Sequence, residues 1–302
     1  MEMLSMTGKR LALSEDCDIR LLKFLWRWKF STTAALAQKF FWAKPIGTAY
    51  NHLRRLEKAG FIACRCDEWG QNFYWMLTRR GLLVIQRELP PLREVGFKSE
   101  HIAHDALVNA VHLGDWLLET PPNVKLFSEQ QLRRLSFEEY PAWVPKSPDH
   151  RPDGYWGLPL KQSTRPIAIE VELHQKEKSI YEDLAKFYED EEAILSVIWL
   201  VPSMKHADRL QSVIRKSVSK RADIHNFLLL PEFQSHCWES VIYLGPERNQ
   251  TLAGYLDAFH KTTYKKPVKS LSKLTRHPLL ETRKSYVASR HSTKPPVNSN
   301  SN

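Results

Sequence analysis

Three carboxylates in the middle of the sequence are spaced so that they could hold one metal ion. Asp153 lies on a strand predicted around residues 153–156, and Glu170 and Glu172 lie on a strand predicted for residues 167–173. If these strands are neighbours, the three side chains converge and repel one another unless a cation lies between them. Carboxylate oxygens select Mg²⁺ or Mn²⁺. The three residues are therefore candidate metal ligands and candidate catalytic residues.

The chemistry that such a site supports is phosphodiester cleavage. A hard cation polarises the phosphodiester, lowers the pKa of its water and stabilises the leaving alkoxide. A structural alternative stays open, because apolar residues alternate strictly with Glu170, Glu172 and His174 along this strand. Such alternation is also the ordinary pattern of a strand with one solvated face.

The elements that would position the carboxylates alternate between helices and strands. In chain order we predict a helix over residues 101–119, strands over 124–127, 153–156 and 167–173, a helix over 178–188, a strand over 195–201, a helix over 205–219 and a strand over 226–230. Apart from Ser196, the strand at 195–201 has no polar side chain, so it should lie inside a sheet that is covered on both faces. The pattern predicts a mixed α/β fold with an αβββαβ core.

The order of elements expected in residues 15–90 predicts a winged helix that binds duplex DNA. Three helices are expected: the first from Asp18 to Trp28, the second after a cap at Ser31 or Thr32, and the third over residues 48–60. Gly60 suits the stop of the third helix. A hairpin with strands at 61–66 and 73–77, joined by a turn at 67–72, and a helix at 78–88 follow. Three helices followed by a hairpin are typical of a helix-turn-helix with a wing.

The third predicted helix is the candidate recognition helix. Its outer face carries the candidate DNA-binding residues Tyr50, Asn51, Arg54, Arg55 and Lys58. Arginine can bind guanine and asparagine can bind adenine through two hydrogen bonds each, whereas lysine suits a phosphate. The alternative is a solvated, charged helix face in a winged helix that binds protein.

The charge of the chain is segregated along its length. Residues 1–100 have a net charge of +7, residues 101–260 of −6, and residues 261–302 of +9. Two basic ends around an acidic middle suggest that the ends hold a polyanion and that the middle carries carboxylate chemistry. The last segment is rich in Lys, Ser, Thr and Pro, so we predict a disordered basic tail.

Neither a membrane span nor a signal peptide is expected. The longest strongly apolar stretch, residues 193–201, is too short to cross a bilayer, and the N-terminus lacks the order of a secretory signal. We therefore expect a cytoplasmic protein. The four cysteines are predicted to be reduced thiols in packed positions, because the pair Cys64 and Cys66 lacks the second pair of ligands that a zinc site needs.

The carboxylate spacing resembles a known family signature. Sixteen residues separate Asp153 from Glu170, and one residue separates Glu170 from Glu172. This spacing resembles the Asp…Glu-x-Glu signature of the MOBC relaxases, the mobilisation proteins of the MobC type. The Pro-Asp-Gly of residues 152–154, the apolar-Glu-Val-Glu of residues 169–172 and the helix that begins at Lys178 are the matching stretches. The resemblance covers roughly residues 15–230.

The resemblance implies a fold, an activity and partners. It implies a winged-helix domain at residues 1–95, a restriction-endonuclease-like PD-(D/E)xK domain at 96–260 and the tail at 261–302. Asp153, Glu170 and Glu172 would bind Mg²⁺ or Mn²⁺ and nick one DNA strand at a plasmid transfer origin during mobilisation or conjugation. Double-stranded DNA and accessory mobilisation or coupling proteins would be the partners.

One residue departs from the usual restriction-fold pattern. Glu172 stands where that fold usually has lysine, so activation of the water would fall to the metal or to Lys176 or Lys178. The same departure keeps a second hypothesis open, in which the core is inactive and the protein is a replication or transcription regulator that binds DNA through its winged helix.

Two further sets of residues are of types that could take part in chemistry. His101 and His104 are three residues apart but lack a third His partner, so we read them as ordinary helix residues; Glu100 or Asp105 could add a fourth carboxylate. The tyrosines that could attack a phosphodiester, among which spacing does not choose, are Tyr50, Tyr155, Tyr181 and Tyr188.

Overall fold

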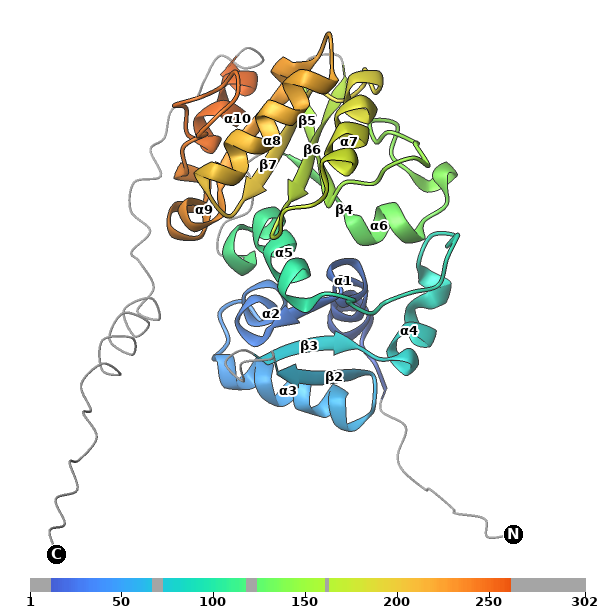
Figure 1. The fold of residues 1–302 in the computed structure, drawn as a ribbon. Helices are drawn as coiled ribbons and strands as arrows, with labels where there is room; N and C mark the ends of the chain where they lie inside the picture. The colour runs from blue at the N-terminus through green and yellow to red at the C-terminus, as the bar shows by residue number, and fades with distance from the viewer. Residues whose placement is uncertain (1–11, 67–72, 118–123, 161–162, 262–302) are drawn as a thin grey trace, which may run out of the picture. The chain divides into compact units, whose positions relative to one another are not determined.

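A computed structural model describes residues 12–66, 73–117, 124–160 and 163–261 (Figure 1). All of them belong to one compact unit, Met1–Thr263. The fold is mixed α/β, which confirms the predicted class. No helix in the described ranges has the length and apolar character that a bilayer crossing requires. The turn predicted for residues 67–72 and the tail from residue 262 onward lie outside the described residues.

The N-terminal elements alternate between helices and short strands. They are η1, a π-helix (Glu15–Ile19), α1 (Arg20–Trp28), β1 (Phe30–Thr32), α2 (Thr33–Phe40), α3 (Ile46–Lys58), β2 (Ile62–Cys66), β3 (Phe73–Leu77) and α4 (Arg79–Ile85). The three strands form an antiparallel sheet in the order β1-β3-β2. The sequence did not predict β1, and the helix predicted to end at Glu88 finishes as a 3₁₀ turn after α4.

Local hydrogen bonds explain where these helices begin and end. The side chain of Ser14 accepts a hydrogen bond from the amide of Asp18 at the start of η1, and Thr32 accepts one from Ala35 at the start of α2. Gly60 follows α3 with a φ of 78°, a conformation that glycine adopts without strain. Of the two predicted cap residues, Ser31 and Thr32, the structure shows Thr32 as the cap, and the predicted stop at Gly60 is confirmed.

The remaining elements build the main sheet and its covering helices. They are α5 (Ile102–Leu117), β4 (Lys125–Ser128), α6 (Glu129–Arg134), β5 (Gly154–Pro159), β6 (Thr164–Val171), α7 (Lys178–Asp190), β7 (Ser196–Val201), α8 (Met204–Ser217), β8 (His225–Leu229), α9 (Leu230–His236) and α10 (Leu252–Lys261). The strand order is β4-β5-β6-β7-β8; β4, β5 and β6 pair antiparallel, and β6, β7 and β8 pair parallel.

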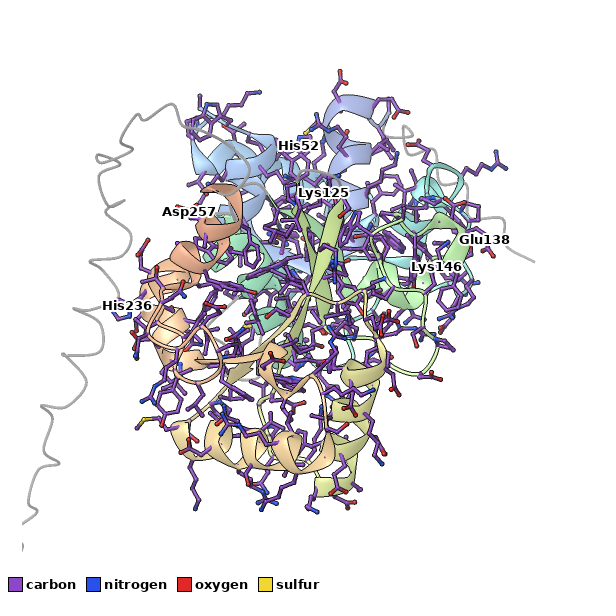
Figure 2. The ribbon with its side chains drawn as sticks, turned by 90° about the horizontal axis from the view of Figure 1, so that it is seen from above. His52, Lys125, Glu138, Lys146, His236 and Asp257 are labelled. Atoms are coloured by element: carbon purple, nitrogen blue, oxygen red, sulfur yellow. The ribbon has the colours of Figure 1, made fainter. Side chains whose placement is uncertain are left out.

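The main sheet is covered on both faces. Ile167, Ile169 and Val171 of β6 pack with residues of α5, α9 and α10, whereas Ala168 belongs to the cluster that includes α7 and α8. The helices α7 and α8 lie side by side (Figure 2). Every residue of β7 is buried between its two neighbouring strands, which confirms the predicted interior strand.

The end of α1 joins the N-terminal elements to the main sheet. The Arg27 guanidinium donates to the carbonyl oxygen of Leu126, and burial lowers the pKa of Arg27 to about 10. Asn109 Nδ2 of α5 donates to the carbonyl oxygen of Trp28 at 2.8 Å. The buried cluster that includes α1 is continuous with the cluster under α7 and α8. The domain boundaries at residues 95 and 260 stay predictions.

Candidate functional site

Two of the predicted ligands, Asp153 and Glu170, lie beside each other at one end of β5 and β6. Asp153 immediately precedes β5, and its backbone amide donates to the carbonyl oxygen of Ile169 at 3.0 Å. Its Oδ2 accepts a hydrogen bond from the amide of Val171 at 2.7 Å. Antiparallel pairing therefore fixes the Asp153 carboxylate next to the strand that carries Glu170. Both side chains line an open cavity of about 380 Å³.

The two glutamates are buried. Glu170 is 4% exposed and Glu172 is 2% exposed. The alternative reading of this strand as a solvated face is therefore wrong. Glu172 lies beyond the last residue of β6, its backbone amide donates to the carbonyl oxygen of Leu200 at 2.9 Å, and it does not line the cavity. The predicted convergence of all three carboxylates is therefore not found within 4.8 Å, because Glu172 follows the end of the strand that carries Glu170. Burial of ionised carboxylates is costly unless each one has a partner.

Each predicted ligand has a protein partner. Glu170 Oε1 lies 2.6 Å from His150 Nε2 and also accepts a hydrogen bond from the Tyr188 hydroxyl. Glu172 Oε1 pairs with the ammonium of Lys176. Burial raises the pKa of Glu172 to about 6, although the Lys176 ammonium opposes this shift. Burial also raises the pKa of Asp153, and the neighbouring His104 opposes that rise.

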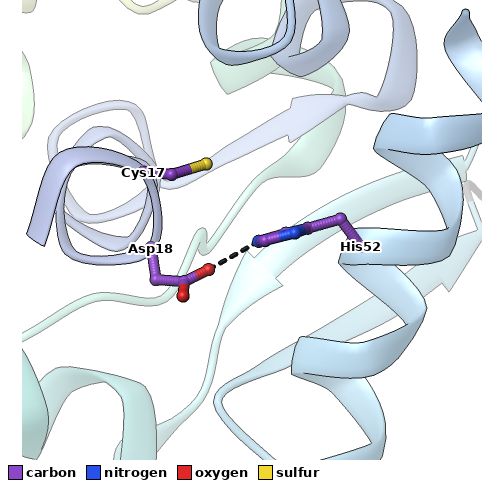
Figure 3. Close-up of side chains that lie close together, drawn as sticks. All are labelled: Cys17, Asp18 and His52. Atoms are coloured by element: carbon purple, nitrogen blue, oxygen red, sulfur yellow. Dashed lines mark hydrogen bonds and ion pairs between the residues drawn. The ribbon is translucent and has the colours of Figure 1, made fainter. Parts of the chain in front are cut away.

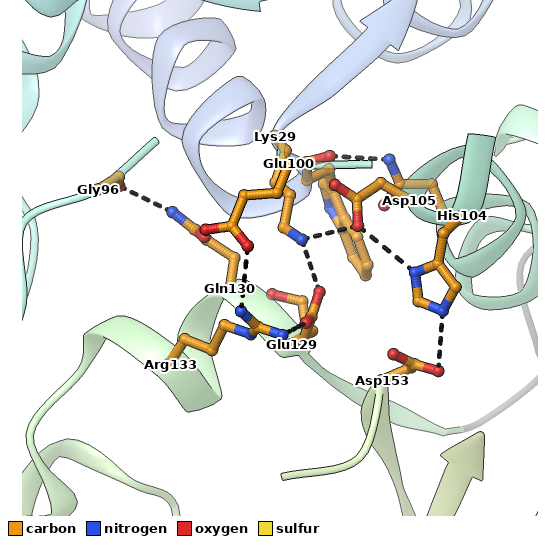
Figure 4. Close-up of polar contacts among 12 residues, drawn as sticks. Lys29, Gly96, Glu100, His104, Asp105, Glu129, Gln130, Arg133 and Asp153 are labelled. Atoms are coloured by element: carbon orange, nitrogen blue, oxygen red, sulfur yellow. Dashed lines mark hydrogen bonds and ion pairs between the residues drawn. The ribbon is translucent and has the colours of Figure 1, made fainter. Parts of the chain in front are cut away.

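His104 links two carboxylates of the site (Figure 4). Its Nδ1 lies 3.7 Å from Asp105 Oδ1, and its Nε2 lies 3.5 Å from Asp153 Oδ2 and 3.0 Å from the carbonyl oxygen of Val171. Burial lowers the pKa of His104, but hydrogen bonds to Asp105 and Asp153 outweigh that effect and raise the pKa to about 10. At neutral pH the ring is therefore a cation. The reading of His104 as an ordinary helix residue missed this placement.

A buried lysine from the N-terminal elements completes the wall of the cavity. Lys29 Nζ lies 2.7 Å from Asp105 Oδ1 and 2.6 Å from Glu129 Oε2 (Figure 4). Arg133 also pairs with Glu129, at 2.6 Å. The sequence gives no local signal for this cluster, because Lys29 and Glu129 are 100 residues apart. Both residues predicted to add a fourth carboxylate, Glu100 and Asp105, line the cavity, and Asp105 pairs with Lys29.

The two candidate lysines differ in position. Lys176 lines the cavity together with Asp153 and Glu170. Lys178 has a side chain that is 62% exposed and pairs with Glu182 one turn further along α7 at 2.6 Å. Of the two lysines that follow Glu172, the structure brings Lys176 to the site.

The four candidate tyrosines also occupy different environments. Tyr188 is fully buried against Glu170, and burial raises its pKa well above the usual value. Tyr155 is buried in the same core, and the Tyr181 hydroxyl accepts a hydrogen bond from the amide of Lys176 at 3.0 Å. Tyr50 lies on α3 and is 48% exposed. Tyr188 is the one that contacts a predicted ligand.

The predicted DNA-binding residues Tyr50, Asn51, Arg54, Arg55 and Lys58 are all exposed on α3. The predicted inner face is confirmed, because Ala49, Leu53 and Leu56 are fully buried.

Both arginines of α3 also have partners within the protein. Arg54 pairs with Glu57 on the same helix. Arg55 reaches back toward η1, where its Nη2 lies 3.4 Å from Asp18 Oδ2. Each side chain keeps substantial exposure, at 55% for Arg54 and 46% for Arg55.

One compact group of three ligand-type side chains lies away from the cavity, between η1 and α3 (Figure 3). In the described ranges, only Cys17, Asp18 and His52 bring three such ligand atoms within 4.8 Å of one another. His52 Nε2 lies 2.5 Å from Asp18 Oδ1, and the Arg55 guanidinium lies within 3.5 Å of both residues. This guanidinium supplies positive charge where a metal ion would lie, so the group fits an ion-paired link between η1 and α3.

The cysteines are free thiols. Cys64 is half-buried on β2 and Cys66 is exposed. The prediction of packed positions is therefore wrong for Cys66, because the side chain lies at the outer end of the hairpin strand.

Neither a protein-family model nor a curated protein matches the chain. The resemblance to the MOBC relaxases stays a prediction, which depends on the carboxylate motif and on the order of the elements around it.

Proposed function

We propose that the protein is a metal-dependent DNA nickase that binds duplex DNA through its N-terminal elements. The observation that carries the proposal is the fixed neighbourhood of Asp153 and Glu170. The hydrogen bond from the Val171 amide holds Asp153 beside β6, and both carboxylates line one cavity. Carboxylates that share an open cavity are suited to a hard divalent cation.

The order of elements around the carboxylates supports a restriction-endonuclease-like core. The series α5, β4, β5, β6, α7, β7 is an αβββαβ unit, interrupted by the short helix α6. Asp153 precedes the second strand of this unit, and Glu170 lies near the end of the third. These are the positions that the resemblance to the MOBC relaxases assigns to the metal ligands. Nicking at a transfer origin of a mobile element is the form of the proposal that follows from this resemblance.

The N-terminal elements support a winged helix. Three helices precede the hairpin of β2 and β3, and β1 pairs with β3 to complete a small antiparallel sheet. In this architecture the third helix enters the major groove. α3 is the third helix, and its exposed face carries Asn51, Arg54 and Lys58.

The side chains of the cavity have separate roles in this proposal. Asp153 and Glu170 would hold Mg²⁺ or Mn²⁺, which would supply positive charge to a phosphodiester oxygen. His150 and Tyr188 fix the orientation of Glu170, and His104 neutralises the region around Asp153. Lys176 lines the same cavity, and its ammonium, which pairs with Glu172, would bind a phosphate oxygen there.

Plasmid nicking tests the proposal. We expect the full-length protein to convert supercoiled plasmid to open circles with Mg²⁺ or Mn²⁺, under conditions where a gel shift shows binding to that plasmid. Asp153→Asn and Glu170→Gln should abolish conversion and keep DNA binding. Glu182→Gln is the matched control, because Glu182 pairs with Lys178 on an exposed face of α7. Binding by the wild-type protein without any open circles would contradict the proposal.

A regulator without catalysis is the second candidate, favoured by one observation. The three predicted ligands already have the protein partners His104, His150 and Lys176, so charge balance does not demand a metal. For a regulator, Asp153→Asn and Glu170→Gln should leave both DNA affinity and biological activity at the wild-type level. For a nickase, the same variants should lose biological activity while they keep affinity.

A further inference from the structure

A row of apolar side chains is exposed on the face of α3 that the proposed function assigns to DNA. Trp42, Ile46 and Tyr50 are 79%, 53% and 48% exposed, and Phe73 at the start of β3 is 62% exposed. These are four of the nine large hydrophobic side chains exposed in the described residues. Large apolar side chains gathered on a surface mark an interaction site.

The two members of the row that lie on α3 are spaced for one side of the helix. Ile46 and Tyr50 are four residues apart on α3, and Trp42 is exposed in the turn that precedes the helix. Residues four apart lie above one another on a helix face. The Tyr50 ring packs against the buried Trp75 ring at a centroid distance of 6.3 Å, so its position is fixed.

The backbone beside the row is open to a close approach. Gly47 follows Ile46, and a Cβ atom placed there would meet no atom within 4 Å. All residues from 42 to 48 are exposed. A groove of DNA could therefore come close to the first turn of α3 without a clash.

Charge identifies the occupant of this surface. Residues 30–66 contain six Lys and Arg residues but a single acidic residue, Glu57, and Arg54 already pairs with it. A second copy of the chain would bring two surfaces of the same sign together, whereas DNA brings phosphates to the cations and base edges to the row.

We propose that Trp42, Ile46 and Tyr50 read thymine methyl groups in the major groove. This inference rests on the proposed binding of DNA by α3. Thymine is the base that presents a methyl group at the major-groove edge, and apolar side chains recognise it by contact. Arg54 lies one turn after Tyr50 and would contact the next step of the site. The target of the protein is accordingly a site with thymines under the first half of α3.

Replacement of thymine by deoxyuridine tests the inference, because it removes the methyl group and keeps the base pair. Binding sites are selected from a random duplex pool with the full-length protein, and each thymine of the selected site is then replaced. For each methyl group that the row buries, we expect affinity to fall about fourfold, and for two of them about 15-fold. Unchanged affinity at every position overturns the inference and leaves DNA binding intact.

Variants of the row test whether its side chains cause the preference for thymine over deoxyuridine. Trp42→Ala and Ile46→Ala should bind the thymine and deoxyuridine duplexes with nearly equal affinity, and their unfolding should match the wild type because both side chains are exposed. Met204→Ala at the start of α8 is the matched control, since Met204 is 55% exposed outside the N-terminal elements. Full discrimination in the Trp42 and Ile46 variants overturns the inference.

Two results would show that these apolar side chains do not contact DNA. If no duplex is selected, the proposed function and this inference both fail. If Trp42→Ala converts a dimer to a monomer and leaves the affinity for DNA unchanged, the row is a contact between copies of the chain and the inference is wrong.

Discussion

Loss of the Lys29 ammonium, which lies where the N-terminal elements meet the main sheet, should lower the free energy of unfolding of the protein. Lys29 is 9% exposed, and its Nζ lies within 2.7 Å of the carboxylates of Asp105 and Glu129, which are 4% and 5% exposed. Lys29→Met leaves both carboxylates buried without this cation, and removal of one partner of a buried ion pair costs about 3–5 kcal/mol. His104 and Arg133 keep partial contact with the two carboxylates, so we expect about 3 kcal/mol.

Urea unfolding measures this loss, and the chain offers a matched control. Lys23 pairs with Glu88 at 2.5 Å, but both side chains are about one-third exposed. An exposed pair contributes about 0–1 kcal/mol, so Lys23→Met should shift the unfolding midpoint little. The triple variant Lys29→Met, Asp105→Asn, Glu129→Gln should recover much of the loss, because no uncompensated charge remains buried. Equal shifts for Lys29→Met and Lys23→Met would refute the reasoning.

Three more predictions concern a glycine, a carboxylate and the tail. Gly154→Ala should destabilise the protein by about 3 kcal/mol, because φ of Gly154 is 151° and the new Cβ would lie 2.9 Å from the Phe127 carbonyl oxygen. Gly47→Ala, in open space on α3, should stabilise the protein by about 0.5–1 kcal/mol. Urea unfolding midpoints measure both changes. The folded pKa of Glu172 is about 6, above its ordinary 4.5, so its contribution to stability is present below pH 4.5 and is lost as pH rises through 6. Relative to Glu172→Gln, the wild type should lose about 2 kcal/mol between pH 4 and pH 7; a constant difference across this range would contradict it. Removal of residues 262–302, which hold nine Lys and Arg residues, should flatten the slope of log affinity for DNA against log salt, and an unchanged slope would exclude a role of these residues in binding.

Local sequence patterns predicted most of the elements. The spacing of apolar residues located α1, α3 and α5, and the run of apolar residues located β7 in the interior of the sheet. The helices α7 and α8 were predicted as well. The three-residue strand β1 and the short helix α6 were missed, because neither is long enough to show a period. β1 depends on its pairing with β3, a contact between segments about 40 residues apart.

The candidate site was predictable only in part. Asp153 and Glu170 were found because each lies next to or within a strand with a clear pattern, and strand pairing then brings them together. Their partners His104 and His150, and Lys29 in the lining of the same cavity, come from segments with no shared pattern, so only the tertiary fold reveals them. The burial of both glutamates was not predictable either, since alternation looks the same on a solvated face and on a face that α7 covers.

The location of a bound metal ion tests the central claim most directly. Crystals of the full-length protein soaked in Mn²⁺ would show the ion by its anomalous scattering. We predict a peak in the cavity at about 2.0–2.3 Å from carboxylate oxygens of both Asp153 and Glu170, and no peak there in Asp153→Asn. A peak confined to Cys17, Asp18 and His52, or a cavity that stays free of Mn²⁺ while the wild-type protein nicks DNA, would contradict the account.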